Sequence, residues 1–168
     1  MHGGDLREGD VTRFFLIGGE RTFTQDPAFG FRQLADVAIR VLSPAVSDPT
    51  TGVQAIDRIS DFLTITGSRP GPAGLRVNAS GAVRVERKLR NFDALLVLAL
   101  TEVIRYGADA PQVVRRLHGM LDELQSTLPG ERQAAIAGQR SLLEAAAGVA
   151  LPAPFTAVAS AADREGLG

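Results

Sequence analysis

The chain has 168 residues, of which 45% are hydrophobic and 22% charged, a composition that predicts one globular domain with a single core. Its formal net charge of −1 gives no general attraction to nucleic acid, and the absence of cysteine excludes disulfides, thiolate metal sites and cysteine nucleophiles. No signal peptide is evident, and no apolar run approaches the roughly 20 residues needed to cross a bilayer, so we expect a soluble, cytoplasmic chain.

Asp26 and Pro27 mark the start of the first clear helix, which we predict over residues 27–42. Aspartate is a favoured N-cap, and proline suits the first helical position because the N–H that it lacks would have no helical partner there. Apolar side chains recur at helical spacing until Ser43 and Pro44. Because the residue before a proline is disfavoured in a helix, the helix is expected to end there.

A second helix with the same opening chemistry is expected over residues 49–65, with Asp48 as its cap and Pro49 as its first residue. A connector rich in glycine and proline follows it. Residues 74–87 then alternate apolar and polar side chains about a glycine-containing turn, which predicts a short β-hairpin.

Three further helices are expected over residues 91–106, 109–128 and 131–148. The middle one carries an apolar stripe from Val113 to Leu128, which we expect to pack within the domain, with a subunit contact as the alternative. The predicted fold is mainly α, with about five packed helices and one short inserted β-hairpin. We expect a single helical domain over residues 1–150 and a mobile tail over residues 151–168.

Charged residues inside the first two helices are the most informative feature. Arg32, Asp36 and Arg40 follow one side of a helix that is otherwise apolar nearly all round, which implies burial. A buried charge needs a partner, so we expect Asp36 to pair with Arg32, with Arg40 or with an arginine of a later helix. On the next helix, Asp57, Asp61 and Arg58 are the natural partners. Three interpretations follow: an internal ion-pair network, a polar pocket for a small anionic ligand, or an ordinary solvated helix face.

Signatures of catalysis and of metal binding are missing. The chain has no nucleophile elbow, no phosphate-binding loop and no dinucleotide-binding glycine motif. Asp57 and Asp61 are one helical turn apart, as are His118 and Asp122, but neither pair has a third ligand at a metal-binding spacing. We therefore expect no enzyme activity, no cofactor and no metal.

The hairpin region is locally basic, and its cationic residues are Arg76, Arg84, Arg87, Lys88 and Arg90. Charges along a hairpin edge prevent it from pairing with other strands, which is the plainest interpretation. The alternatives are weak contact with an anionic membrane surface and a winged nucleic-acid contact. Because the chain has no basic recognition helix, we expect no nucleic-acid partner.

Residues 20–59 contain the motifs RTFTQDPAFG, RQLADVA, SPAVSDPTT and DR. In this stretch the chain resembles a bacterial family of predicted membrane proteins, domain of unknown function 2254. The resemblance implies the soluble C-terminal region of such proteins, with Ser47 where the family usually carries asparagine. Family members carry transmembrane helices before this region, so we expect an isolated domain or a chain whose true start lies upstream. As part of a full-length member, it would be membrane-associated.

The charged residues and the motif residues together form the candidate site, interpreted as a ligand-binding or a structural polar network. Its members are Arg21, Gln25, Asp26, Arg32, Asp36, Arg40, Ser43, Ser47, Asp48, Thr51, Asp57 and Arg58. The resemblance and the missing catalytic motifs lead us to expect a non-enzymatic regulatory or assembly domain, associated with itself or with a membrane-embedded segment. The alternative is a sensor of a small anionic ligand, received by arginine side chains near the SPAVSDP turn.

Overall fold

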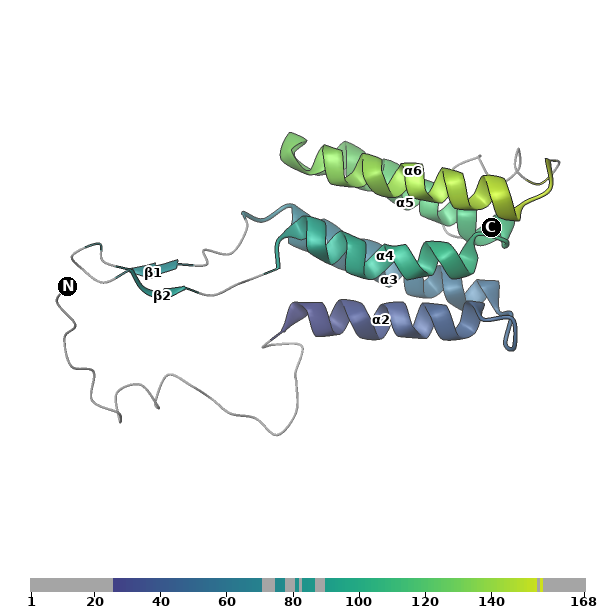
Figure 1. Cartoon of the computed structure of the whole chain (residues 1–168), viewed down its shortest axis with the longest axis horizontal. Helices are drawn as coiled ribbons and strands as arrows, with labels where there is room; N and C mark the ends of the chain where they lie inside the picture. The colour runs from purple at the N-terminus through teal and green to yellow at the C-terminus, as the bar shows by residue number, and fades with distance from the viewer. Residues whose placement is uncertain are drawn as a thin grey trace.

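Helices in three layers make up the body of the molecule (Figure 1). The computed structural model describes residues 26–70, 75–77, 81, 83–86, 90–153 and 155. In this part of the chain the α-helices are α2 (Pro27–Leu42), α3 (Pro49–Gly67), α4 (Phe92–Gly107), α5 (Pro111–Thr127) and α6 (Gln133–Ala150). A 3-10 turn, η1 (Gly130–Arg132), lies between α5 and α6.

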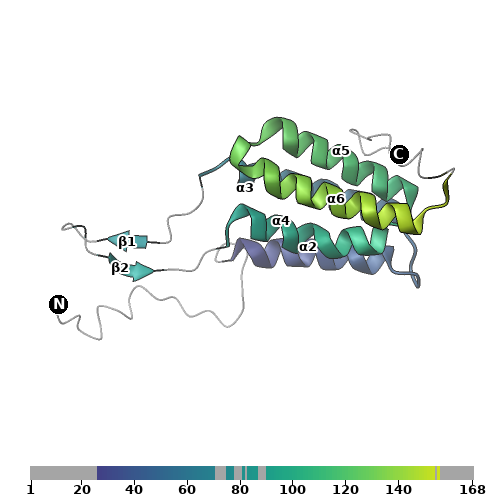
Figure 2. The same ribbon diagram turned by 45° about the horizontal axis from the view of Figure 1, so that its top comes forward.

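The helices α3 and α4 form the middle layer, with α2 on one side and α5 and α6 on the other (Figures 1 and 2). Successive helices run in alternating directions, so the connections between them alternate between the two ends of the bundle. The central helix α4 contacts α2, α3, α5 and α6. The composition of α4 explains its central position, because a helix that is apolar on most of its circumference is stable only when neighbouring helices cover it.

Local capping chemistry sets where the helices begin. The Asp26 carboxylate accepts a hydrogen bond from the N–H of Ala28, and the Asn91 side chain accepts one from the N–H of Ala94. Both Asp-Pro starts were predicted and are confirmed, since α2 begins at Pro27 and α3 at Pro49. These bonds satisfy N–H groups that have no partner inside a helix.

The apolar stripe of α5 lies in the core. Its large side chains are fully buried, namely Val113, Leu117, Met120, Leu121 and Leu124. The expected packing of this stripe within the domain is confirmed, and the stripe offers no surface for a subunit contact. The helices approach closely at Gly67, where an added Cβ would lie 2.6 Å from Leu128 Cδ1 and 2.8 Å from Phe92 Cε2.

Two short strands stand apart from the helices. Strands β1 (Leu75–Val77) and β2 (Val83–Glu86) pair antiparallel with each other and lie beyond one end of the bundle (Figure 1). The expected fold class is therefore corrected: the packed domain is all-helical, and no strand among the described residues is built into it. Alternating polar and apolar residues indicate an extended chain, but strands pack into a core only where an apolar surface is left uncovered. Here the helices already bury one another's apolar faces.

Most of the predicted mobile tail, residues 151–168, lies outside the described residues. Helix α6 ends at Ala150, and the N–H of Leu151 still donates to the carbonyl of Ala147. Residue 154 and residues 156–168 lie outside the described residues, as do residues 1–25 of the expected helical domain.

Candidate functional site

The turn between α2 and α3 brings several candidate residues together. The Ser43 hydroxyl donates to the carbonyl of Arg40 at 2.7 Å, and the N–H of Asp48 donates to the carbonyl of Val41 at 2.8 Å. Between them Ser47 has a φ of 49°, in the left-handed region. This backbone reversal turns the chain within a few residues and places Asp48 at the start of α3.

Asp48 and Thr51 form the most tightly bonded pair of the candidate set. The Asp48 carboxylate accepts from the Thr51 N–H at 3.1 Å and from the Thr51 hydroxyl at 2.5 Å. The Thr51 hydroxyl, helped by the Thr51 backbone N–H, holds the pKa of the Asp48 carboxyl below its ordinary value of 3.8. The carboxylate therefore stays ionised and caps α3 across the neutral pH range.

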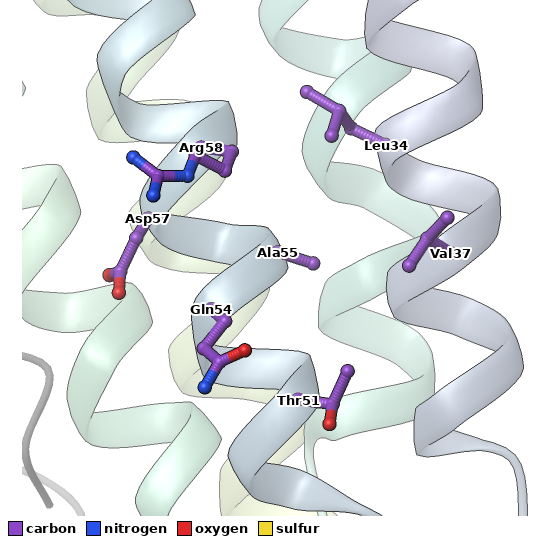
Figure 3. A pocket seen from close by; sticks show the side chains of 7 residues that line it. All are labelled: Leu34, Val37, Thr51, Gln54, Ala55, Asp57 and Arg58. Carbon is purple, nitrogen blue, oxygen red and sulfur yellow. The ribbon is translucent and has the colours of Figure 1, made fainter.

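A cleft opens between α2 and α3 beside this cap. Its volume is about 370 Å³, and it is lined by Leu34, Val37, Thr51, Gln54, Ala55, Asp57 and Arg58. Leu34 of α2 and Ala55 of α3 point toward each other across it, whereas Arg58 projects from α3 away from α2 (Figure 3). The cleft thus combines an apolar wall with a hydroxyl, an amide, a carboxylate and a guanidinium, a combination that suits binding of a partly apolar group.

Exposed apolar side chains continue along the same face. Val37 is 48% exposed, Phe62 52% and Ile65 50%. The ring of Phe62 meets that of Phe31 edge to face, with 6.1 Å between the ring centroids. Phe31 is buried, so its contact fixes one side of Phe62 and leaves the other side in solvent.

Three expected members of the network lie on the other side of α2. Arg32 bonds Asp36 at 3.1 Å and approaches Glu102 of α4 at 3.7 Å, so the pairing predicted for Asp36 is confirmed. The prediction that these charges are buried is wrong, because both side chains are about half exposed and Arg40 is exposed. These side chains point outward from the core, and neither Arg32 nor Arg40 lines the cleft.

The buried ion-pair network lies instead between α3 and α5. Arg116 is only 6% exposed; its Nε donates to Asp57 at 2.5 Å and its Nη1 donates to Glu123 at 3.1 Å. The Ser60 hydroxyl also lies 3.5 Å from Glu123. Burial opposes the charged form, but the bonds to Asp57 and Glu123 outweigh it and raise the pKa of Arg116 above its ordinary value.

Sequence reasoning missed Arg116, although its position carried a signal. It follows Val113 by three residues and precedes Met120 by four, which places it on the apolar stripe that points into the core. An arginine on such a stripe needs a carboxylate, and Glu123 follows one turn after Met120.

Several candidate residues are not placed. Arg21, Gln25, Arg87 and Lys88 lie outside the described residues, and of the hairpin only the strand backbones that carry Arg76 and Arg84 are described. Arg90, just before α4, is exposed. Arg58 lies 3.4 Å from Asp61 on the solvent side of α3.

His118 lies at the junction of α5 and α6 and is half-buried. Burial, together with the positive charge of Arg140, lowers the pKa of His118 below 6.5. Arg140 itself bonds Asp122 at 2.6 Å. In the described part of the chain no group of three histidine, aspartate or glutamate side chains gathers as a metal site would require.

The fold and the cleft define a small helical bundle with a partly apolar surface site that carries one acidic and one basic side chain. The chain belongs to the family described as predicted membrane protein (DUF2254), whose model matches residues 3–123. It is similar to one uncharacterized protein of Mycobacterium bovis and two of Mycobacterium tuberculosis, each 33% identical over 136 residues.

These matches cover 80% of this chain and 26% of each relative, so the chain spans about a quarter of their length. No solved structure matches the chain. Among the helices that the structure describes, none has both the length and the hydropathy of a membrane-spanning segment.

Proposed function

We propose that this chain is a non-enzymatic assembly domain, which joins proteins of its membrane-protein family through the outer face of α2 and α3. The observation that carries the proposal is the line of exposed apolar side chains formed by Val37, Phe62 and Ile65 beside the cleft. Apolar side chains gathered on a rigid surface and bordered by charges are typical of protein contacts. The membership in a family of predicted membrane proteins supports a partner of the same kind.

Photo-crosslinking from position 62 tests the assembly function. Phe62 is replaced by p-benzoylphenylalanine in the cells that make the protein, and adducts formed under illumination are identified by mass spectrometry. The control carries the same group at Val149, which is 91% exposed on α6. We expect a defined adduct, either with a second copy or with a membrane protein, from position 62 only. Equal labelling from both positions, or none from position 62, would contradict the proposal.

A second candidate function is a sensor of small anions. It is favoured by Arg58, which lines the cleft together with the Thr51 hydroxyl and the Gln54 amide. Thermal-shift assays with phosphate and with citrate test it, because a ligand at 100 times its Kd stabilises the folded state by about 2.7 kcal/mol. A shift that Arg58→Gln abolishes supports the sensor; no shift with either anion, or a shift that survives Arg58→Gln, counts against it.

A further inference from the structure

The exposed side of α3 has the spacing of a helix–helix seam. Arg58, Phe62 and Ile65 follow one another at intervals of four and three residues, and Ala55 precedes Arg58 by three. Alternating intervals of three and four place side chains in one line along a helix, as in coiled coils. Ala55 is buried against α2, whereas Phe62 and Ile65 are half exposed, so the line runs from the cleft out onto an uncovered surface.

Two charges on this side of α3 are placed so that they could pair with the same two charges of a second copy. Arg58 and Asp61 carry opposite charges and sit three residues apart, with side chains 72% and 63% exposed. A contact with two-fold symmetry places residue i against residue j and residue j against residue i. If two α3 helices cross antiparallel about a point midway between these residues, Arg58 of each copy faces Asp61 of the other.

The same arrangement makes the apolar features complementary. From the midpoint of positions 58 and 61, both Ile65 and Gln54 are about 5.5 residues away, or about 8 Å in opposite directions along the helix. Gln54 marks the cleft, whose apolar wall includes Leu34 and Val37. An antiparallel partner therefore brings its Ile65 to the mouth of this cleft, and the reverse holds for the other copy.

We propose that the partner of the α2–α3 face is a second copy of this chain, bound α3 against α3 about a two-fold axis. Arg58 of each copy pairs with Asp61 of the other, and Ile65 of each copy enters the opposite cleft beside Val37. This inference rests on the proposed assembly function and names the partner of the same surface. The charge reciprocity favours a second copy over an unrelated protein, which would need its own matching pair of charges.

Complementary charge reversals test the pairing. Arg58→Glu and Asp61→Arg each create like charges across the two-fold, so each variant alone is expected to dissociate at least tenfold more readily than the parent in sedimentation velocity. When the two variants are mixed, opposite charges face each other again at both contacts across the two-fold axis, so a heterodimer is expected to form. Pairing within one chain cannot produce this recovery. Arg105→Glu, an equal charge change at an exposed position of α4, should leave the parent dimer intact.

The outcomes distinguish failure of the proposed partner from failure of the proposed assembly function. The proposal of a second copy as the partner is overturned if the parent chain stays monomeric at the highest accessible concentration. It is also overturned if neither charge reversal weakens the dimer, or if the mixture of the two variants remains monomeric. If the chain is monomeric but position 62 crosslinks to another membrane protein, the assembly function stands with a different partner. Circular dichroism melts of each variant confirm that loss of the dimer is not loss of the fold.

Discussion

At the scale of single residues, Ser47 carries the least favourable backbone conformation of the turn, with a φ of 49°. Asparagine and glycine enter the left-handed region more easily than serine does. We expect Ser47→Asn to raise the free energy of unfolding by about 0.5–1 kcal/mol, which urea titration measures. Ser68→Asn is the control, because Ser68 has a φ of −73°. A Ser47 variant no more stable than the parent would show that the turn is not strained.

Arg116 provides a second test at this scale. Arg116→Met keeps much of the aliphatic packing but leaves Asp57 and Glu123 without their cation. Breaking a buried pair typically costs about 3–5 kcal/mol; because both carboxylates are partly solvated, we expect a loss of about 2–3 kcal/mol in urea unfolding. Arg105→Met, at an exposed site on α4, should change stability by less than about 0.5 kcal/mol. Equal stability of both variants would refute a stabilising role for the Arg116 network.

Between elements, packing at the junction of α3, α4 and α5 depends on Gly67. A methyl group there meets Leu128 Cδ1 at 2.6 Å and Phe92 Cε2 at 2.8 Å, so Gly67→Ala should destabilise the bundle by about 1–3 kcal/mol. Gly138→Ala is the matched control inside α6, where an added Cβ meets nothing within 4 Å. Since alanine is the better helix former, that variant should gain about 0.5–1 kcal/mol. Thermal melts that shift in the same direction for both would contradict this explanation.

The starts of α2 and α3 were predictable from sequence because capping depends on neighbouring residues, as at Asp26 and Asp48, whereas α5 begins at Pro111 without a side-chain cap. The exposure of Arg32 and Asp36 was not, because periodicity shows which side chains share a face but not which neighbour covers it. The Asp57–Arg116 pair joins residues far apart in the chain, and only tertiary packing brings them together. Thr51, Asp57 and Arg58 of the predicted candidate site line the cleft, while its apolar wall depends on how α2 lies against α3.

For the whole molecule, the hairpin lies at the end of the bundle where α3 stops and α4 begins (Figure 1). Its sequence carries Arg76 and Arg84, and each basic residue near an anionic membrane surface contributes about 1 kcal/mol. We expect weak, salt-sensitive binding to anionic vesicles in a flotation assay, reduced by Arg76→Gln together with Arg84→Gln. Arg40→Gln, on the bundle, is the control. Equal binding to neutral vesicles, or no binding at low salt, would exclude this contact.

The close approach of Gly67 to Phe92 has a consequence for how the chain can vary. These residues end α3 and begin α4, so the segment that carries the hairpin leaves the bundle and returns to it at nearly one point. The entropic free-energy cost of closing such a loop grows only with the logarithm of its length, by about 0.6 kcal/mol for each doubling. The hairpin can therefore lengthen, shorten or change its charge with little effect on the helical core, and the two parts can respond to different selective pressures within one gene.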